Sequence, residues 1–193
     1  MYVLLLFLTD LLYTYHTIIS EKRKAATMKY FDYYISPQGT MLIQEEDGHL
    51  THLGLADPEK LPADFPAKQK DTPLIRSAKM QLGEYFQGRR KTFDLPLNPG
   101  GTLFQQKVWQ ALCTIPYGET RSYKEIAVQV ENPKGCRAVG MANNRNPIMI
   151  IIPCHRVIGS NGSLVGYAGG LDIKEWLLEH EYKNSHLFVE RTD

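Results

Sequence analysis

The residue best suited to nucleophilic chemistry is Cys154, which closes an apolar run and precedes two basic residues. Ile148–Ile152 and Pro153 lead into it, and His155 and Arg156 follow. We expect this apolar setting to place the thiol at the floor of a pocket. A free cysteine has a pKa of about 8.5, so a reactive thiol needs a neighbouring cation or an oriented base. The alternative is a cysteine that only fills the core.

The cysteine pattern fits neither a disulfide framework nor a zinc site. Cys113, Cys136 and Cys154 are odd in number and widely spaced, which favours a reducing, cytoplasmic setting. The chain has no C-x-x-C pair, and its six histidines show no ligand spacing relative to the cysteines. The sequence therefore predicts no metal.

Charge is nearly balanced over the whole chain but not along it. The formal net charge is +1, which does not by itself indicate a nucleic-acid partner. Between residues 121 and 156 there are six cations and two acids, whereas residues 28–101 carry nine cations and ten acids. A modest basic stripe in the second half is compatible with phosphate contact and equally with an ordinary solvated face.

The first half has the pattern of a small mixed α and β unit. Strands are predicted over 29–36, 40–44 and 50–55, with a turn at Pro37–Gly39 and a hairpin at Asp47–Gly48. Residues 56–72 hold three prolines and many charges and are predicted to be an exposed connection. A helical pattern then begins at Pro73 and ends at about Gly88.

The second half begins after Asn98–Gly101, the clearest break in the chain. Apolar residues at helical spacing follow, from Phe104 to Ile115. Ser122 and Glu125 have the spacing of a capping box, which predicts a short helix to about Val130. A turn at 132–135 and a helix over 136–143 complete a helix-turn-helix pattern, and a last amphipathic helix is predicted over 171–181.

Residues 1–27 are predicted to be an upstream extension outside the fold. The apolar stretch from Tyr2 to Ile19 is interrupted by Asp10 and His16 and has no cation before it. It is therefore poor as a signal peptide and marginal as a membrane span. We expect the protein to start at Met28 and to have no membrane association.

Four motifs in the second half resemble, by their order and spacing, the methylated-DNA–protein-cysteine methyltransferase family. They are Asn146-Pro147, Pro153-Cys154-His155-Arg156-Val157, Gly166-Tyr167-Ala168-Gly169-Gly170 and Lys174-Glu175-Trp176-Leu177-Leu178. The similarity runs from about Phe104 to Glu181 and is looser before that. It implies an α/β (α+β) fold, with a ribonuclease-H-like N-terminal domain over 28–100 and a winged helix-turn-helix, DNA-binding domain over 101–193.

The resemblance implies direct-reversal DNA repair without a diffusible cofactor. Cys154 would take an alkyl group from O6 of guanine in duplex DNA, once and irreversibly, with alkylated O4 of thymine as a second candidate substrate. His155 would act as its base through a water, and Glu181 would orient and charge-stabilise His155. Asn146 would tie the turn that holds Cys154 to the preceding helix. Without the resemblance, Glu181 is more typical of a solvated helix end and Asn146 of a helix C-cap.

The resemblance also implies how the damaged base would be held. Tyr123 would be the general acid toward guanine. The backbone of Cys154 and Val157 would accept from the exocyclic amine, and the amide of Ala168 would donate to O6. Some family members have Ser where this chain has Ala168.

Two further side chains are implied to shape the pocket. Tyr167 would pack on the base or close the pocket, although an ordinary core aromatic is equally compatible with the sequence. Met149 stands where some members have Pro, which would alter the width of the pocket.

A reaction at O6 requires the nucleotide to leave the stack. Arg137 matches the family's intercalating arginine, and the small residues Ala138 and Gly140 would let the helix come close to the minor groove. Arg145 and Tyr123 are further expected DNA contacts. Arg137 is also compatible with an ordinary phosphate contact.

Two other classes of protein remain to be separated from this one. A cysteine hydrolase using Cys154, His155 and Glu181 would turn over, whereas alkyl transfer stops at one group per chain. A non-catalytic module that recognises alkylated DNA would bind the lesion and leave it intact. The expected partner is double-stranded DNA containing O6-alkylguanine, bound by a monomer.

Overall fold

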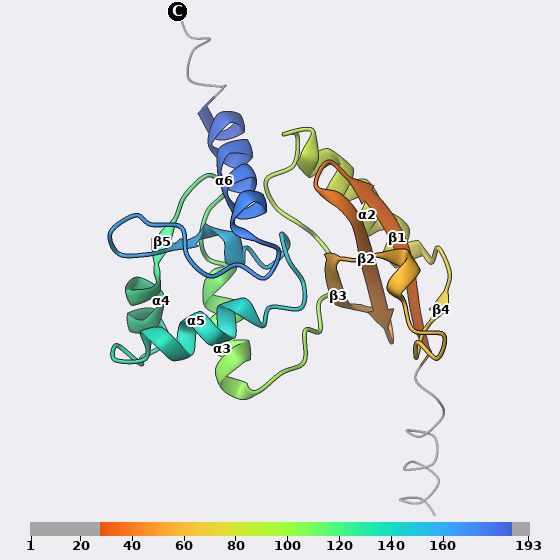
Figure 1. The fold of residues 1–193 in the computed structure, drawn as a ribbon, viewed down its shortest axis with the longest axis horizontal. Helices are drawn as coiled ribbons and strands as arrows, with labels where there is room; N and C mark the ends of the chain where they lie inside the picture. The colour runs from red at the N-terminus through yellow and green to blue at the C-terminus, as the bar shows by residue number, and fades with distance from the viewer. Residues whose placement is uncertain (1–27, 187–193) are drawn as a thin grey trace, which may run out of the picture.

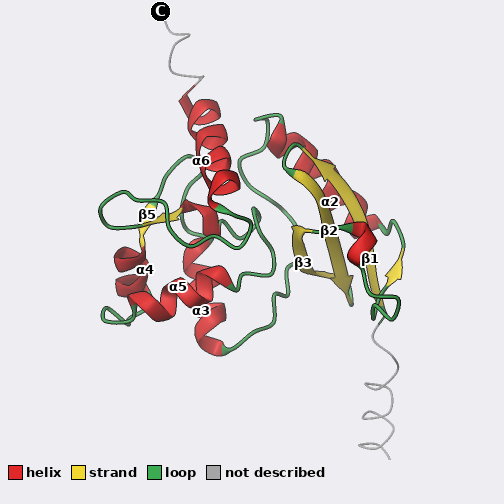
Figure 2. Cartoon of the chain, viewed as in Figure 1, coloured by secondary structure: helices red, strands yellow, loops and turns green. Residues whose placement is uncertain are grey.

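The computed structural model of the protein describes residues 28–186. A sheet with one long helix forms the N-terminal half, and a cluster of helices forms the C-terminal half (Figure 1). Figure 2 shows how nearly all strand structure is confined to the first half. The predictions for residues 1–27 lie outside the described residues.

The sheet has the strand order β3-β2-β1-β4. Its strands are β1 (Lys29–Ser36), β2 (Gly39–Glu46), β3 (His49–Leu55) and β4 (Lys68–Gln69). The first three run antiparallel, and the turn between β2 and β3 places Asp47 and Gly48 at φ 50° and 73°. A two-residue turn with positive φ at both positions matches the twist of the strands, which explains the predicted Asp-Gly hairpin.

The connection over residues 56–72 contains more structure than the sequence predicted. It holds a 3-10 turn, η1 (Pro58–Lys60), and the strand β4, which pairs in parallel with β1. The expectation of an exposed connection is confirmed, since most of residues 56–71 are exposed. The sequence did not predict β4, because two residues suffice to extend a sheet edge and leave no periodicity.

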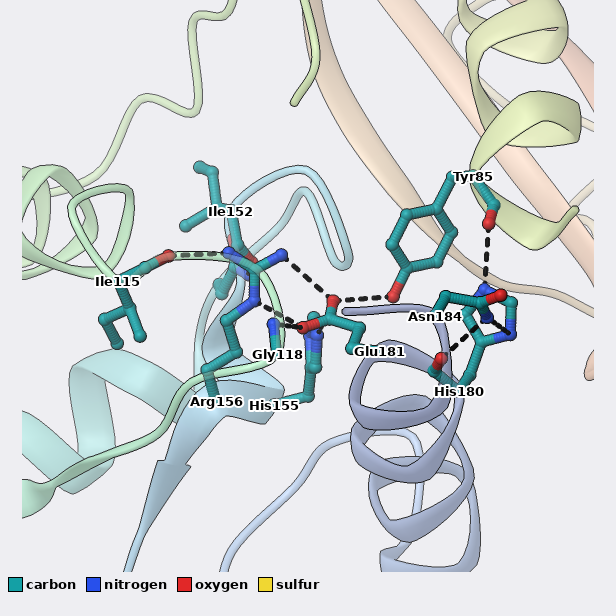
Figure 3. A network of polar contacts seen from close by, with 10 residues as sticks. Tyr85, Ile115, Gly118, Ile152, His155, Arg156, His180, Glu181 and Asn184 are labelled. Carbon is teal, nitrogen blue, oxygen red and sulfur yellow. Dashed lines mark hydrogen bonds and ion pairs between the residues drawn. The ribbon is translucent and has the colours of Figure 1, made fainter. Parts of the chain in front are cut away.

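Helix α2 (Pro73–Phe86) packs against the three antiparallel strands. Thr72 caps its start by accepting a hydrogen bond from the amide of Ile75, and Pro73 occupies the first turn. Gly88, at φ 72°, allows the chain to leave the helix. Tyr85, in the last turn, is fully buried and points toward the C-terminal half (Figure 3).

Three helices of the C-terminal half pack on one another: α3 (Leu103–Leu112), α4 (Tyr123–Gln129) and α5 (Cys136–Asn144). The capping box of Ser122 and Glu125 is present at α4, so that prediction is confirmed. Helices α4 and α5, joined by the turn before Cys136, form the helix-turn-helix. The small parallel pair β5 (Arg121–Ser122) and β6 (Val157–Ile158), which the sequence did not predict, lies beside them.

The last helix, α6 (Leu171–His186), continues five residues beyond the predicted end at Glu181. Glu181 is 1% exposed. The alternative of a solvated helix end is therefore wrong, because the carboxylate finds its partners inside the protein.

The two halves share one apolar core and one isolated backbone bridge. Buried residues of α2, β2 and β3 belong to the same cluster as those of α3, α4 and the segment before Cys154. Leu53 pairs with Ile148 across the two halves, whereas the isolated bridge between Leu50 and Leu97 lies within the N-terminal half. Within residues 28–186, no helix has both the length and the apolar character needed to cross a bilayer.

Candidate active site

Cys154 begins a single 3-10 turn, η2 (Cys154–Arg156), directly after the buried segment Ile148–Ile152. Its side chain is 5% exposed, and burial raises the pKa of the thiol to about 11. Hydrogen bonding from Asn146 opposes this shift. The resting group is therefore a protonated thiol at neutral pH, and it needs a base before it can act as a nucleophile.

Asn146 holds the turn that presents the thiol. Its side-chain amide lies 2.8 Å from the carbonyl oxygen of Ile152 and 3.0 Å from Sγ of Cys154, and its Oδ1 accepts from the amide of Ile148. Inside this turn Ile150 adopts φ 70°, which is strained for a β-branched residue. Asn146 thus forms hydrogen bonds to both ends of the turn and to the sulfur.

His155 lies next to the thiol in sequence and is 0% exposed. Its Nε2 lies 2.8 Å from Oε1 of Glu181. Since Glu181 is ionised, Nε2 carries the proton, and Nδ1 is left as the acceptor of a neutral ring. Burial lowers the pKa of His155 despite the opposing effect of Glu181. The ring is therefore neutral at pH 7, the state that a base requires.

Glu181 is the centre of the buried polar network in Figure 3. Arg156 donates to both carboxylate oxygens at 2.8 and 2.9 Å, and the amide of Gly118 donates to Oε2 at 3.1 Å. Burial alone would raise the pKa of Glu181, but hydrogen bonds from His155 and Arg156 and the charge of Arg156 hold it well below its usual range. The carboxylate stays charged and fixes the orientation of His155.

The N-terminal half contributes to this network through Tyr85. Its hydroxyl donates to Oε1 of Glu181 at 2.8 Å, and its carbonyl oxygen accepts from Nε2 of His180 at 2.8 Å (Figure 3). Tyr85 belongs to α2, whereas His180 and Glu181 belong to α6. The end of α2 therefore fixes the helix that carries the carboxylate.

We expect Tyr85→Phe to lower the free energy of unfolding by about 1.5–3 kcal/mol, because it removes a buried hydrogen bond to a charged group. Chemical denaturation measures this loss. Tyr34→Phe is the matched control, since Tyr34 stacks on Phe86 in the same half without contacting Glu181. Equal stability of the two variants would show that the Tyr85 hydroxyl contributes nothing.

Lys174 is a buried cation that the sequence analysis did not single out. It is 0% exposed, and its Nζ donates to the carbonyl oxygens of Val157 at 2.6 Å and Val165 at 2.8 Å. Burial lowers its pKa to about 8, and its charge acts to lower the pKa of the Cys154 thiol. Lys174 therefore joins the loop before α6 to the segment that carries the nucleophile.

A cavity of ≈ 300 Å³ opens onto Cys154. Its lining contains several residues that the sequence analysis assigned to the substrate or the nucleophile: Asn146, Met149, Cys154, Tyr167 and Ala168. The other lining residues are Asn143, Pro147 and Gly169 of the C-terminal half and His52, Leu53, Gly54 and Leu55 of β3. The sulfur is thus reached through a pocket built by both halves.

Tyr123 and Val157, which the resemblance also assigned to the damaged base, are not part of the lining of this cavity. The hydroxyl of Tyr123 donates to the carbonyl oxygens of Val165 and Gly166 at 3.0 and 3.3 Å. Burial raises the pKa of Tyr123, and so does charge on Cys154. Tyr123 is thus protonated and electrostatically coupled to the thiol. The carbonyl of Val157 already accepts from Lys174, so one lone pair remains for another donor.

The residues expected to meet DNA lie on α5 and just after it. Arg137, at its start, is exposed, as is Arg145 after its end, whereas Ala138 and Gly140 are half-buried. A Cβ at Gly140 would lie 3.8 Å from the ring of Tyr123. One cation of the predicted basic stripe is not on the surface: Arg156 is 6% exposed and paired with Glu181.

Among the site residues without a role in the sequence analysis are the side chains of Tyr85, Asn143 and Lys174, which form hydrogen bonds there. Asn143 donates to the carbonyl oxygen of Cys154 at 3.3 Å. Lys174 stands inside a recognised motif, which was an available signal, but no local pattern marks Tyr85. Across the described residues, no group of three or more His, Cys, Asp or Glu side chains could hold a metal ion. That the protein uses no metal stays a prediction.

The fold and site define a class: a sheet domain joined to a helix-turn-helix domain, with a buried cysteine, histidine and carboxylate at one pocket. Residues 29–99 match the family model described as 6-O-methylguanine DNA methyltransferase, ribonuclease-like domain. Residues 103–183 match the one described as 6-O-methylguanine DNA methyltransferase, DNA binding domain. The chain belongs to this methyltransferase family, as its motifs predicted.

Individual relatives agree with this assignment. A methylated-DNA–protein-cysteine methyltransferase of Methanosarcina barkeri is 54% identical over 158 residues, which cover 80% of this chain and 98% of the relative. The constitutive one of Bacillus subtilis is 50% identical over 160 residues, covering 80% and 96%.

Solved structures show the same fold. The O6-methylguanine methyltransferase of Mycobacterium tuberculosis has a TM-score of 0.75 at 45% identity, covering 81% of this chain and 94% of that one. The Mycobacterium tuberculosis OGT in complex with DNA has a TM-score of 0.73 at 44% identity, covering 80% and 94%. The predicted ribonuclease-like and DNA-binding architecture is therefore confirmed.

Proposed function

We propose that this protein repairs DNA by transferring a methyl or other alkyl group from O6 of guanine to its own Cys154. The observation that carries this proposal is the buried Cys154 thiol at the floor of a pocket, beside a neutral His155 that Glu181 orients. Family membership supports the same reaction. A thiol buried without such a base would be inert.

The reaction balances with the residues present. The Cys154 proton passes to Nδ1 of His155 through a water, and the sulfur attacks the alkyl carbon. The carbon–sulfur bond forms as the carbon–O6 bond breaks, and the electron pair stays on guanine. Tyr123 donates its hydroxyl proton to guanine. The proton held on His155 then returns Tyr123 to its neutral form. The thioether product has no good leaving group, so each chain reacts once.

The test is to incubate the protein with a duplex that holds one O6-methylguanine and to measure intact and peptide masses. We expect one methyl group on the peptide that contains Cys154, with no further addition. Removal of alkyl groups from many guanines by each chain would point to a hydrolase. Tight lesion binding without a mass change would point to a non-catalytic recognition module.

Base flipping is the second part of the proposal. Arg137 is exposed at the start of α5. Ala138 and Gly140 beside it are half-buried and have little or no side chain, so they add little bulk to the surface of the helix. A small-residue helix surface permits a close approach to the minor groove, and Arg137 then fills the gap that the extruded nucleotide leaves. Arg145 and Tyr123 lie on the same helix-turn-helix as further DNA contacts.

We expect Arg137→Ala to slow repair of duplex DNA by about 10- to 100-fold, because flipping costs a few kcal/mol that this side chain partly offsets. Reaction with the free base O6-benzylguanine should change far less, since a free base needs no flipping. Single-turnover rates on both substrates measure the difference.

Lys134→Ala is the matched control, since Lys134 is an exposed cation in the turn before the same helix. It should cost only a small, salt-dependent loss on duplex DNA. Equal losses for Arg137→Ala on duplex and free base would contradict the flipping role.

The domain bounds, the oligomeric state and the location complete the proposal. We propose that the N-terminal domain covers residues 28–100 and the C-terminal domain 101–193, with residues 1–27 as an upstream extension. We also propose a monomer that acts in the cytoplasm, where its thiols stay reduced. Cys113, Cys136 and Cys154 are free cysteines, which supports that setting.

A further inference from the structure

The cavity in front of Cys154 has a wall that the reaction described above does not use. Four consecutive residues of β3 form it: His52, Leu53, Gly54 and Leu55. This strand belongs to the N-terminal half, whereas the groups proposed to hold guanine all lie in the C-terminal half. The β3 wall therefore encloses space that the base contacts leave unassigned.

Backbone hydrogen bonds fix the β3 wall to the segment that leads to the nucleophile. The amide of Leu53 donates to the carbonyl oxygen of Pro147 at 2.8 Å, and the amide of Met149 donates to the carbonyl oxygen of Leu53 at 2.9 Å. Leu53 itself is 1% exposed and points into the core. Because side chains alternate along a strand, His52 and Gly54 share the opposite face.

On that face the imidazole of His52 lies over Gly54. A Cβ at Gly54 would lie 3.0 Å from Nε2 of His52, so the ring lies across the space that glycine leaves open. Burial lowers the pKa of His52, so the ring is uncharged at neutral pH. An uncharged ring can pack against an apolar group without the cost of desolvating a charge.

We propose that His52, packed over Gly54, sets the largest alkyl group that the pocket accepts. The inference rests on the proposed function, because only an alkyl transferase holds such a group at Cys154. A methyl group needs little more room than the approach to the sulfur itself. A longer or aromatic group must occupy the rest of the cavity, part of which the β3 wall bounds.

The experiment compares single-turnover rate constants on two duplexes of identical sequence, one with O6-methylguanine and one with O6-benzylguanine. DNA binding and flipping contribute to both, so the benzyl-to-methyl ratio reports the fit of the alkyl group. We expect His52→Ala to raise this ratio by about tenfold and His52→Trp to lower it by a similar factor. His49→Ala is the matched control, because His49 is an exposed histidine of the same strand that does not line the cavity.

The outcomes separate this inference from the proposed function. If the native chain methylates Cys154 but both His52 variants keep the native ratio, the role of His52 is wrong while the repair function stands. A lower ratio for His52→Ala, or the same shift in His49→Ala, also overturns it. If the native chain gains no methyl group on Cys154, the proposed function itself fails. Circular dichroism of each variant checks that the ratios come from folded protein.

Discussion

Cys154→Ser is expected to abolish alkyl transfer while leaving binding to alkylated DNA in place. A serine hydroxyl at this position is far less acidic than a thiol, and the neutral His155 beside it is a weak base in a buried setting. The loss of rate should be on the order of 10³-fold or more, as expected when the nucleophile of a covalent reaction is removed. Single-turnover transfer from a duplex with O6-methylguanine measures it.

Cys113→Ser is the control for this substitution, because Cys113 is exposed and does not line the cavity that opens onto Cys154. It should transfer the methyl group at the native rate. Methyl addition to the Cys154→Ser variant at another cysteine, at a rate near the native one, would show that Cys154 is not the acceptor.

Glu181→Gln is expected to reduce transfer by about 100-fold or more, since replacing the carboxylate that orients a catalytic histidine has large effects in comparable triads. The amide keeps the size of the side chain but removes the charge that holds the proton of His155 on Nε2. It also leaves Arg156 without its buried counter-ion. Single-turnover kinetics with the folded variant give the loss.

The same carboxylate is expected to support the fold. Glu181→Ala should destabilise the protein by about 3–5 kcal/mol, because Arg156 becomes an uncompensated buried charge. The pKa of Glu181 is lowered in the folded state. Its contribution is therefore complete above the unfolded pKa, about 4.3, and is lost as pH falls toward the folded value. Urea denaturation between pH 3 and pH 7 measures this.

Glu179→Gln serves as the control, because Glu179 lies on the same helix in an exposed pair with Lys183. Exposed pairs contribute about 0–1 kcal/mol. A Glu181→Gln variant as stable and as active as Glu179→Gln would remove Glu181 from the catalytic network.

The network explains why the N-terminal half matters to a reaction carried out by the C-terminal half. Tyr85 of α2 and His155 both bond Oε1 of Glu181, and β3 closes one side of the cavity that leads to Cys154. The N-terminal half therefore acts at two places, on the carboxylate and on the pocket.

The sequence by itself determined the main elements and the burial of Cys154. The limits of β1 and the starts of α2 and α5 agree with the pattern, since hairpin, proline and turn signals act over a few residues. The buried cysteine with His155 and Arg156 beside it was visible in the same way. Glu181 was placed in the site by family resemblance alone, because nothing local distinguishes it from an exposed helix residue.

Only the tertiary structure decided which distant groups meet. Tyr85 is 96 residues from Glu181 in the chain, yet their oxygens lie 2.8 Å apart. Arg156 has the sequence appearance of a surface cation, but its buried position requires a carboxylate partner. His52 lies in a half that carries none of the recognised chemistry. Local patterns record backbone preference and the face that is buried, whereas these contacts depend on how the two halves pack together.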